Sequence, residues 1–158
     1  MLHACRIVVD GMPSEGRRTV LRRLAWSSVP SPSFSAAALD EIVASARRNN
    51  ERHHVSGMML FTGAHFLGVL EGAEWDLANL WQKLGRDDRH GDLRRIGDVL
   101  CGDRWFPKWI MSRTDNAIVR AQIESLRVRQ VRSPTAGWAE AIRPIMLRAG
   151  AVQGLVSH

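Results

Sequence analysis

Two adjacent histidines, His53 and His54, have side chains that could bind a metal. Histidine nitrogens bind metals and haem, so such a pair is a candidate ligand set. Adjacent residues on a loop or strand point in different directions, however, and no third ligand lies at an informative spacing. Two cysteines, Cys5 and Cys101, also lack the spacing of a metal site or a disulfide framework. We therefore do not predict a metal site.

Catalytic patterns do not emerge from the sequence either. We find no paired carboxylates, no nucleophile with a base at an informative spacing and no phosphate-binding loop, so we do not expect an enzyme. No apolar run reaches the length of a membrane span, and the first residues lack the apolar core of a signal peptide. We expect a cytoplasmic chain with reduced cysteines and no membrane contact.

The charge balance is basic, with 22 Lys and Arg against 16 Asp and Glu. The arginines form scattered pairs, at 17–18, 22–23, 47–48 and 94–95. Such a surface could bind nucleic acid or an acidic protein. Because the pairs are dispersed and no recognition motif accompanies them, we favour ordinary solvated faces and treat nucleic-acid binding as the weaker interpretation.

The elements that must position any site are organised around the stretch from His54 to Gly72. Two apolar runs, Val55–Phe61 and His65–Leu70, flank a short turn and predict a β-hairpin. Both runs are too continuously apolar for strands with one face in water, so we expect both faces to be covered, one of them by helices. A helix with an apolar stripe follows and is predicted to end at a glycine cap near Gly85.

The remaining elements follow in order along the chain. We predict a first strand at Thr19–Ser28, a helix capped by Ser35 and running to about Asn50, and strands at Leu93–Cys101 and Trp109–Arg113. The order β-α-β-β-α-β-β is typical of an α+β ferredoxin-like fold with two helices on one face of the sheet. We assign residues 19–113 to this domain and treat residues 1–18 as an N-terminal extension of uncertain order.

Residues 114–158 are predicted to be helical. One helix is expected at Asn116–Gln130 and a second from near Trp138, separated by a break at residues 133–137. Pro144 is expected to kink or restart the second helix. This pair could cover the other face of the sheet, which an open sheet requires.

Several short motifs follow one another along the chain in a recognisable order. They are Trp26-x-Ser28, Asn49-Asn50, Val55-Ser56-Gly57, Phe66 with Leu70-Glu71-Gly72, Asp87-x-Arg89-His90, and Arg104-x-Phe106-x-x-Trp109-x-Met111. Together they resemble the BLUF domain, a flavin-binding blue-light sensor module with a ferredoxin-like fold. The resemblance covers roughly residues 19–113, and the two terminal helices are similar to those of short, single-domain BLUF proteins.

The resemblance implies a flavin between the two sheet-packed helices, usually FAD and alternatively FMN. By position, Asn50 would hydrogen-bond the carbonyl and N–H edge of the flavin, with Asn49 close by, and an amide suits this because it both donates and accepts. Arg47, Arg89 and His90 would border the outer end, where a phosphate needs cations. The other expected cofactor neighbours are Trp26, Ser28, Phe66 and Gly68.

The resemblance also assigns a signalling role to Trp109 and Met111 on the fifth strand, a pair that changes environment on illumination in this family. Each assignment has a simpler alternative. Asparagine is common at helix ends for its turn geometry, which would account for Asn49 and Asn50. Trp109 and Met111 could be plain core residues.

Two positions depart from the family pattern. BLUF photochemistry uses a Tyr on the first strand and a Gln on the third, and these positions are occupied here by Trp26 and Gly68. The indole N–H only donates a hydrogen bond, and glycine has no side chain to rearrange. We therefore predict that the ordinary photocycle is absent. If the two positions are adjacent, the indole could fill the space left by the missing Gln side chain.

Three functions remain open from the sequence. The first is a BLUF-type sensor that binds flavin but has a lost or altered light response. The second is a flavin-free regulator that uses the BLUF scaffold for protein interaction, and the third is a nucleic-acid-binding module. For the first two we expect output through an unidentified downstream protein or through homo-oligomer formation, because we find no effector domain.

Overall fold

The hairpin at the centre of the chain forms as its apolar runs predict. In the computed structural model, which describes residues 20–130 and 137–151, β2 (Ser56–Phe61) pairs antiparallel with β3 (Phe66–Gly72). Thr62 closes the turn, because its Oγ1 accepts a hydrogen bond from the backbone N–H of His65 at 3.0 Å. Gly63 supplies the left-handed conformation of the turn, with φ +83°.

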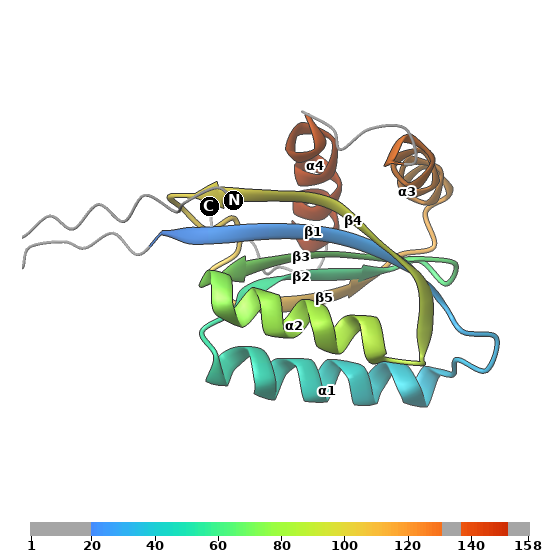
Figure 1. Ribbon diagram of the computed structural model, residues 1–158. Coiled ribbons are helices and arrows are strands. Elements are labelled where there is room, and N and C mark those ends of the chain that lie inside the picture. The colour runs from blue at the N-terminus through green and yellow to red at the C-terminus, as the bar shows by residue number, and fades with distance from the viewer. Residues whose placement is uncertain (1–19, 131–136, 152–158) are drawn as a thin grey trace, which may run out of the picture.

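The hairpin sits inside a five-stranded sheet with the order β4-β1-β3-β2-β5 (Figure 1). The strands β1 (Leu21–Pro30) and β4 (His90–Cys101) continue the antiparallel pairing, and β5 (Trp109–Arg113) runs parallel to β2. The helices α1 (Ala36–Arg52) and α2 (Glu74–Arg86) lie on one face. The helices α3 (Ala117–Gln130) and α4 (Trp138–Ala151) lie on the other. The ferredoxin-like prediction is therefore confirmed.

The sheet separates two apolar cores because successive side chains of a strand point to opposite faces. On β1, Leu24 and Trp26 belong to the core beneath α1 and α2, whereas Ala25 belongs to the core beneath α3 and α4. The second core is tied to the sheet by Trp138 of α4, which lies against Gly97. A Cβ atom at Gly97 would come within 2.0 Å of the Trp138 ring, so only glycine permits this contact.

The predicted element ends are partly right. Ser35 caps α1 as expected, its Oγ accepting from the N–H of Ala38 at 3.1 Å. The predicted glycine cap of the second helix is wrong, because α2 continues through Gly85 and its cap is Asp87 in an extended conformation. Pro144 does not restart the last helix, since α4 is one helix with Pro144 inside it. β1 extends to Pro30, two residues beyond the predicted end.

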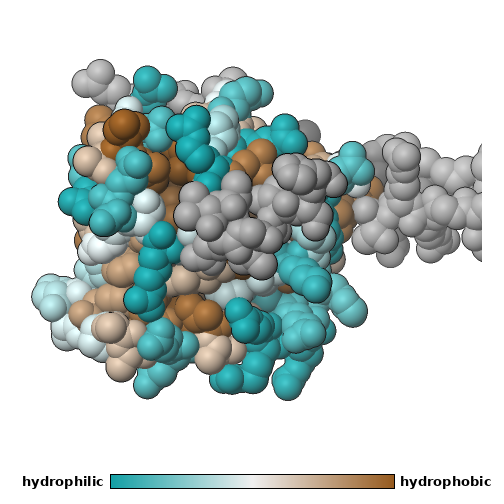
Figure 2. Space-filling model, turned by 180° about the vertical axis from the view of Figure 1, so that it is seen from behind, coloured by the Kyte–Doolittle hydropathy of each residue, from teal (hydrophilic) through white to brown (hydrophobic). Residues whose placement is uncertain are grey.

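Two expectations fall outside the described part of the chain: the N-terminal extension at residues 1–18 and most of the break at 133–137. Within the described ranges, no helix is both long enough and apolar enough to cross a membrane. On the face seen from behind in Figure 2, hydrophilic and apolar residues are interspersed rather than gathered into one polar field.

The position of Gly85 inside α2 gives a simple stability test. A Cβ atom added to this helical residue would have no other atom within 4 Å, so it would enter open space. Gly85→Ala should therefore raise the free energy of unfolding by about 0.5–1 kcal/mol, as measured by urea denaturation. Gly63→Ala is the control, because its φ of +83° makes the same change unfavourable. A destabilised Gly85→Ala variant would contradict the helical assignment.

Candidate functional site

The two residues predicted to replace the family's Tyr and Gln lie directly opposite each other. Trp26 of β1 pairs in register with Gly68 of β3. A Cβ at Gly68 would come 2.3 Å from Cε2 and 2.4 Å from Nε1 of Trp26, so the indole lies across the bare backbone of Gly68. The expected complementarity between a large and an absent side chain is thus present, and the indole covers the sheet on the α1 and α2 side.

Buried polar atoms without partners gather on this same face. Five of the seven such atoms in the described residues belong here: Nε1 of Trp26, Oγ of Ser28, Oδ1 of Asn50 and both ring nitrogens of His90. The other two belong to His65, next to the hairpin turn, and to Arg120 of α3. Leaving such an atom unpaired costs about 1–3 kcal/mol, so native structures seldom keep several. The indole can only donate, the amide oxygen only accepts, and the hydroxyl and imidazole can do both. This set suits a ligand that carries both hydrogen-bond donors and acceptors.

His90 lies near two aromatic rings of this face. Its ring centroid lies 6.1 Å from that of Trp26 and 6.2 Å from that of Phe66. Burial lowers the pKa of His90, and the nearby Asp87 carboxylate only partly opposes this. The imidazole is therefore held in its neutral form, in which one nitrogen donates and the other accepts.

The gap between the two helices opens to solvent as a polar groove of about 230 Å³. Its lining includes Asn49 and His53 of α1 and Asp76 and Lys83 of α2. Lys83 Nζ donates to Asn49 Oδ1 at 3.3 Å, and His53 Nδ1 lies 3.1 Å from Asp76 Oδ1. Asn49 thus lies at the rim of the groove, whereas its neighbour Asn50 is buried. His53 takes part in an inter-helix contact.

The two arginines expected at the outer end of a cofactor differ in whether their side chains are already bound to other residues. Arg47 is exposed and makes no hydrogen bond or ion pair within the described ranges. Arg89 is instead bound to Asp87, with Nε and Nη2 donating to its carboxylate at 2.8 and 2.6 Å. This pairing lowers the pKa of Asp87. Of the two arginines, Arg47 is therefore the one immediately available to an anion.

The ring of Phe66 packs against other aromatic rings. Its centroid lies 4.7 Å from that of Phe61 and 5.4 Å from that of Phe34. The proposed signalling pair, Trp109 and Met111, is half-buried and packs against the same α1 and α2 core. The structure therefore places both residues beside the candidate site, and their role in signalling stays a prediction.

Two of the motif residues have a structural explanation. Glu71 is fully buried and accepts from Arg23 Nε at 2.7 Å and from the backbone N–H groups of Trp105 and Phe106 at 2.8 and 3.0 Å. Arg104 donates to the carbonyl of Glu71 at 2.7 Å and to Ser56 Oγ at 2.6 Å. These contacts fasten the connection between β4 and β5 onto the hairpin.

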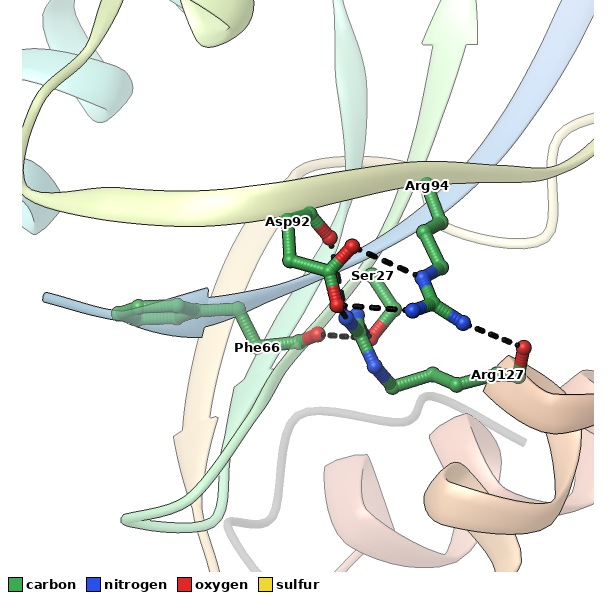
Figure 3. Close-up of polar contacts among 5 residues, drawn as sticks. All are labelled: Ser27, Phe66, Asp92, Arg94 and Arg127. Atoms are coloured by element: carbon green, nitrogen blue, oxygen red, sulfur yellow. Dashed lines mark hydrogen bonds and ion pairs between the residues drawn. The ribbon is translucent and has the colours of Figure 1, made fainter.

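Sequence reasoning missed a polar cluster on the opposite face, formed by Ser27, Asp92, Arg94 and Arg127 (Figure 3). Arg127 of α3 is buried, and it donates to Ser27 Oγ at 2.9 Å and to Asp92 Oδ2 at 2.6 Å. The only signal in the sequence is that Arg127 lies four positions after Ile123, on the buried side of that helix. Nothing in the sequence singles out Asp92.

The contact between Trp26 and Gly68 can be tested by a double-mutant cycle. Gly68→Ala should destabilise the protein by about 1–3 kcal/mol, because the new Cβ would overlap the indole. In a Trp26→Leu background the same change should cost almost nothing, since the indole is gone. Denaturation with urea would measure the four stabilities, and equal costs in both backgrounds would show that the indole does not cover Gly68.

The burial of His90 predicts a pH dependence of stability. Its pKa in the folded protein is lowered from 6.5, so the unfolded chain binds the proton more tightly. The stability that comes from keeping this imidazole neutral should be fully present well above pH 6.5 and should be lost progressively as the pH falls through 6.5. His90→Gln should flatten this slope, leaving the contribution of His65, whose pKa burial also lowers.

His54→Gln, at an exposed position, is the control for that experiment. Asp87 and Asp92 do not interfere, because their pKa values are lowered from 3.8 and the stability they contribute is lost only below about pH 4. An unchanged slope in His90→Gln would contradict the buried, neutral state of this residue.

Comparison with known proteins supports the same family. The family model for sensors of blue light using FAD, BLUF, matches residues 21–112. The photoactivated adenylate cyclase subunit alpha of Euglena gracilis is 29% identical over 129 residues, which cover 79% of this chain and 13% of that protein. The blue light- and temperature-regulated antirepressor BluF of Escherichia coli K12 is 35% identical over 63 residues, covering 40% of this chain and 15% of that protein. The chain thus spans only about an eighth of the length of the cyclase subunit.

Solved structures agree on the fold. The dark-state structure of BlrB, a BLUF protein, has a TM-score of 0.65 at 21% identity and covers 83% of this chain and 98% of its own. The photo-activated state of BlsA has a TM-score of 0.63 at 16% identity, covering 87% and 96%. At these identities the likeness establishes the fold, and the family match over residues 21–112 establishes membership. This chain belongs to the BLUF family of flavin-binding blue-light sensors.

Proposed function

We propose that this protein is a regulatory BLUF protein without enzymatic activity that binds a flavin between the sheet and helices α1 and α2, and that its ordinary blue-light photocycle is lost. The observation that carries the cofactor proposal is the set of unpartnered buried polar atoms at Trp26, Ser28, Asn50 and His90. An apolar core residue at any of these positions would avoid the cost of an unpaired group. Their presence on one face of the sheet is explained if a polar ring fills the space.

The hydrogen-bonding groups of these residues match those of a flavin. When bound, a flavin supplies a blue-light-absorbing ring with hydrogen-bonding carbonyls and a ring N–H. Asn50 Oδ1 would accept from a ring N–H, Trp26 Nε1 would donate to a ring acceptor, and Ser28 and His90 would adapt to either role. The exposed guanidinium of Arg47 would bind a phosphate, which favours FAD or FMN over a flavin that has no phosphate.

The proposed loss of the photocycle rests on Trp26 and Gly68. In the family, the Tyr yields an electron and a proton, and the amide of the Gln rearranges its hydrogen bonds. Here the indole offers one donor and no acceptor, and the space of a Gln side chain is occupied by that indole. The site therefore lacks the parts that would exchange hydrogen bonds on illumination.

A flavin-free interaction module is the second candidate, and one observation favours it. Polar pairs link α1 and its C-terminal cap to α2, between Lys83 and Asn49 and between His53 and Asp76, so the two helices make contacts that need no ligand. Nucleic-acid binding is less well supported, because Arg22, Arg23 and Arg94 are each paired with a carboxylate. In both leading proposals the output passes to another protein or to self-association.

The cofactor proposal is tested by the visible spectrum of the purified protein and by titration with FAD and FMN. We expect a flavin band with vibrational fine structure, and at least a tenfold loss of affinity in Asn50→Leu, because the isosteric change removes the hydrogen bonds of a buried amide. Asn49→Leu, at the groove rim, is the matched control and should change affinity less. A folded, colourless protein that rejects both flavins would contradict the proposal.

The photocycle proposal has its own test. Blue light should cause no reversible red shift in the flavin-loaded protein, whereas Trp26→Tyr with Gly68→Gln should gain one. The two changes must be made together, because a side chain at residue 68 overlaps the indole. A reversible red shift in the unmodified protein would overturn this part of the proposal.

A further inference from the structure

Arg127 lies on the opposite side of the sheet from the candidate flavin site, with its side chain only 6% exposed. A buried guanidinium is costly unless its donors are satisfied. One nitrogen donates to Ser27 Oγ at 2.9 Å, and another donates to the carboxylate and carbonyl of Asp92 at 2.6 and 3.0 Å (Figure 3). The strand also holds the backbone of this helix residue, because Arg94 donates to the carbonyl of Arg127 at 2.9 Å.

Asp92 stands at an irregularity between β1 and β4. Ser27 pairs with Arg94 and Val29 pairs with Gly91, so two residues of β4 stand opposite Ser28 alone. This is a β-bulge, a feature that re-aims side chains next to functional sites. Asp92 adopts φ +47°, a left-handed conformation that is uncommon for residues with a Cβ although Asp enters it more readily than most, and its carboxylate is bound by Arg94 and Arg127.

Side chains next to the bulge lie on both faces of the sheet. On the α1 and α2 side, Ser28 and His90 flank it, and both carry unpartnered buried polar atoms. On the α3 side, Asp92 and Ser27 receive the guanidinium of Arg127. Ser27 Oγ in turn donates to the carbonyl of Phe66 at 2.7 Å, which extends the connection to β3.

We propose that Arg127 is a positioning residue for the flavin site, and that it couples this site to α3 by holding the β4 bulge at Asp92 in its left-handed conformation. The inference rests on the proposed function, because that function supplies the flavin as the ligand of the site. Arg127 acts through the bulge, which sets the positions of Ser28 and His90. This route crosses the sheet at β1 and β4 and is separate from the Trp109 and Met111 pair on β5.

Coupling of this kind must be reciprocal. A ligand that bonds to Ser28 and His90 stabilises the bulge, and the stabilised bulge holds Arg127 and with it the end of α3. Conversely, releasing Arg127 weakens the ligand site. Occupancy of the site is therefore expected to be detectable in α3, on the far face of the sheet.

The first experiment compares Arg127→Met with Arg129→Met, a matched change at an exposed arginine on the same helix. Arg127→Met should weaken FAD binding about tenfold, within the usual range of coupling between sites. Arg129→Met should change it less than twofold. Hydrogen exchange should show that FAD protects α3 in the unmodified protein and in Arg129→Met, and that this protection is lost in Arg127→Met.

A second variant separates positioning from general stability. Glycine adopts positive φ without a Cβ penalty, so Asp92→Gly should let the bulge form without Arg127. The double variant Asp92→Gly, Arg127→Met should recover FAD affinity to within about threefold of the unmodified protein, while α3 stays unprotected. A generic loss of stability would show no such rescue.

Equal FAD affinities in the two single variants, or no rescue in the double variant, would overturn the inference. If the unmodified protein binds no flavin, the proposed function fails, and exchange in the unliganded proteins still decides the role of Arg127. Residues 90–94 should then exchange faster in Arg127→Met than in Arg129→Met, and equal rates would reject the link. Where Arg127→Met does not fold, Arg127→Gln replaces it in both comparisons.

Discussion

The structure on the ligand side of the sheet depends on one packing constraint: the indole of Trp26 lies where a side chain of residue 68 would be. Neither position can change alone without a loss of stability, because a side chain at 68 collides with the ring and a smaller residue at 26 leaves a void over bare backbone. The same contact fixes the direction of the indole N–H, which is buried without a partner among the described residues. Packing and hydrogen-bonding chemistry at the site are therefore set by the same pair of residues.

The sheet that carries this pair also divides the protein into two cores. Because β1 alternates, Trp26 and Ser28 face α1 and α2, while Ala25 faces α3 and α4. Side chains on the two faces cannot touch, so any effect of a ligand on the terminal helices must pass through backbone or around an edge. A bulge is the natural place for this, because its conformation is shared by both faces and is less constrained than a regular ladder.

Local patterns were enough to predict most of the fold. The hairpin, the order of elements and the Ser35 cap follow from periodicity and capping chemistry within a few residues. The cap of α2 was mispredicted, although its end near Gly85 was not, because the cap is Asp87, where Arg89 binds the carboxylate. The Trp26 and Gly68 contact was predictable from the opposed change in size. Arg127 was not, because its partner Ser27 lies 100 positions away in the sequence.

The residues that make the family resemblance fall into two groups with different consequences. Glu71 and Arg104 fasten the β4–β5 connection to the hairpin through buried hydrogen bonds, so their presence reports on the fold. Asn50 and His90 instead carry unpaired polar atoms that packing within the described residues does not explain, which is why we place them at the proposed ligand site. A chain can keep both groups and still lack the phenol and amide on which the light reaction depends. In the function that we propose, ligand binding and light sensing are therefore separate properties, and the atoms that line this site favour only the first.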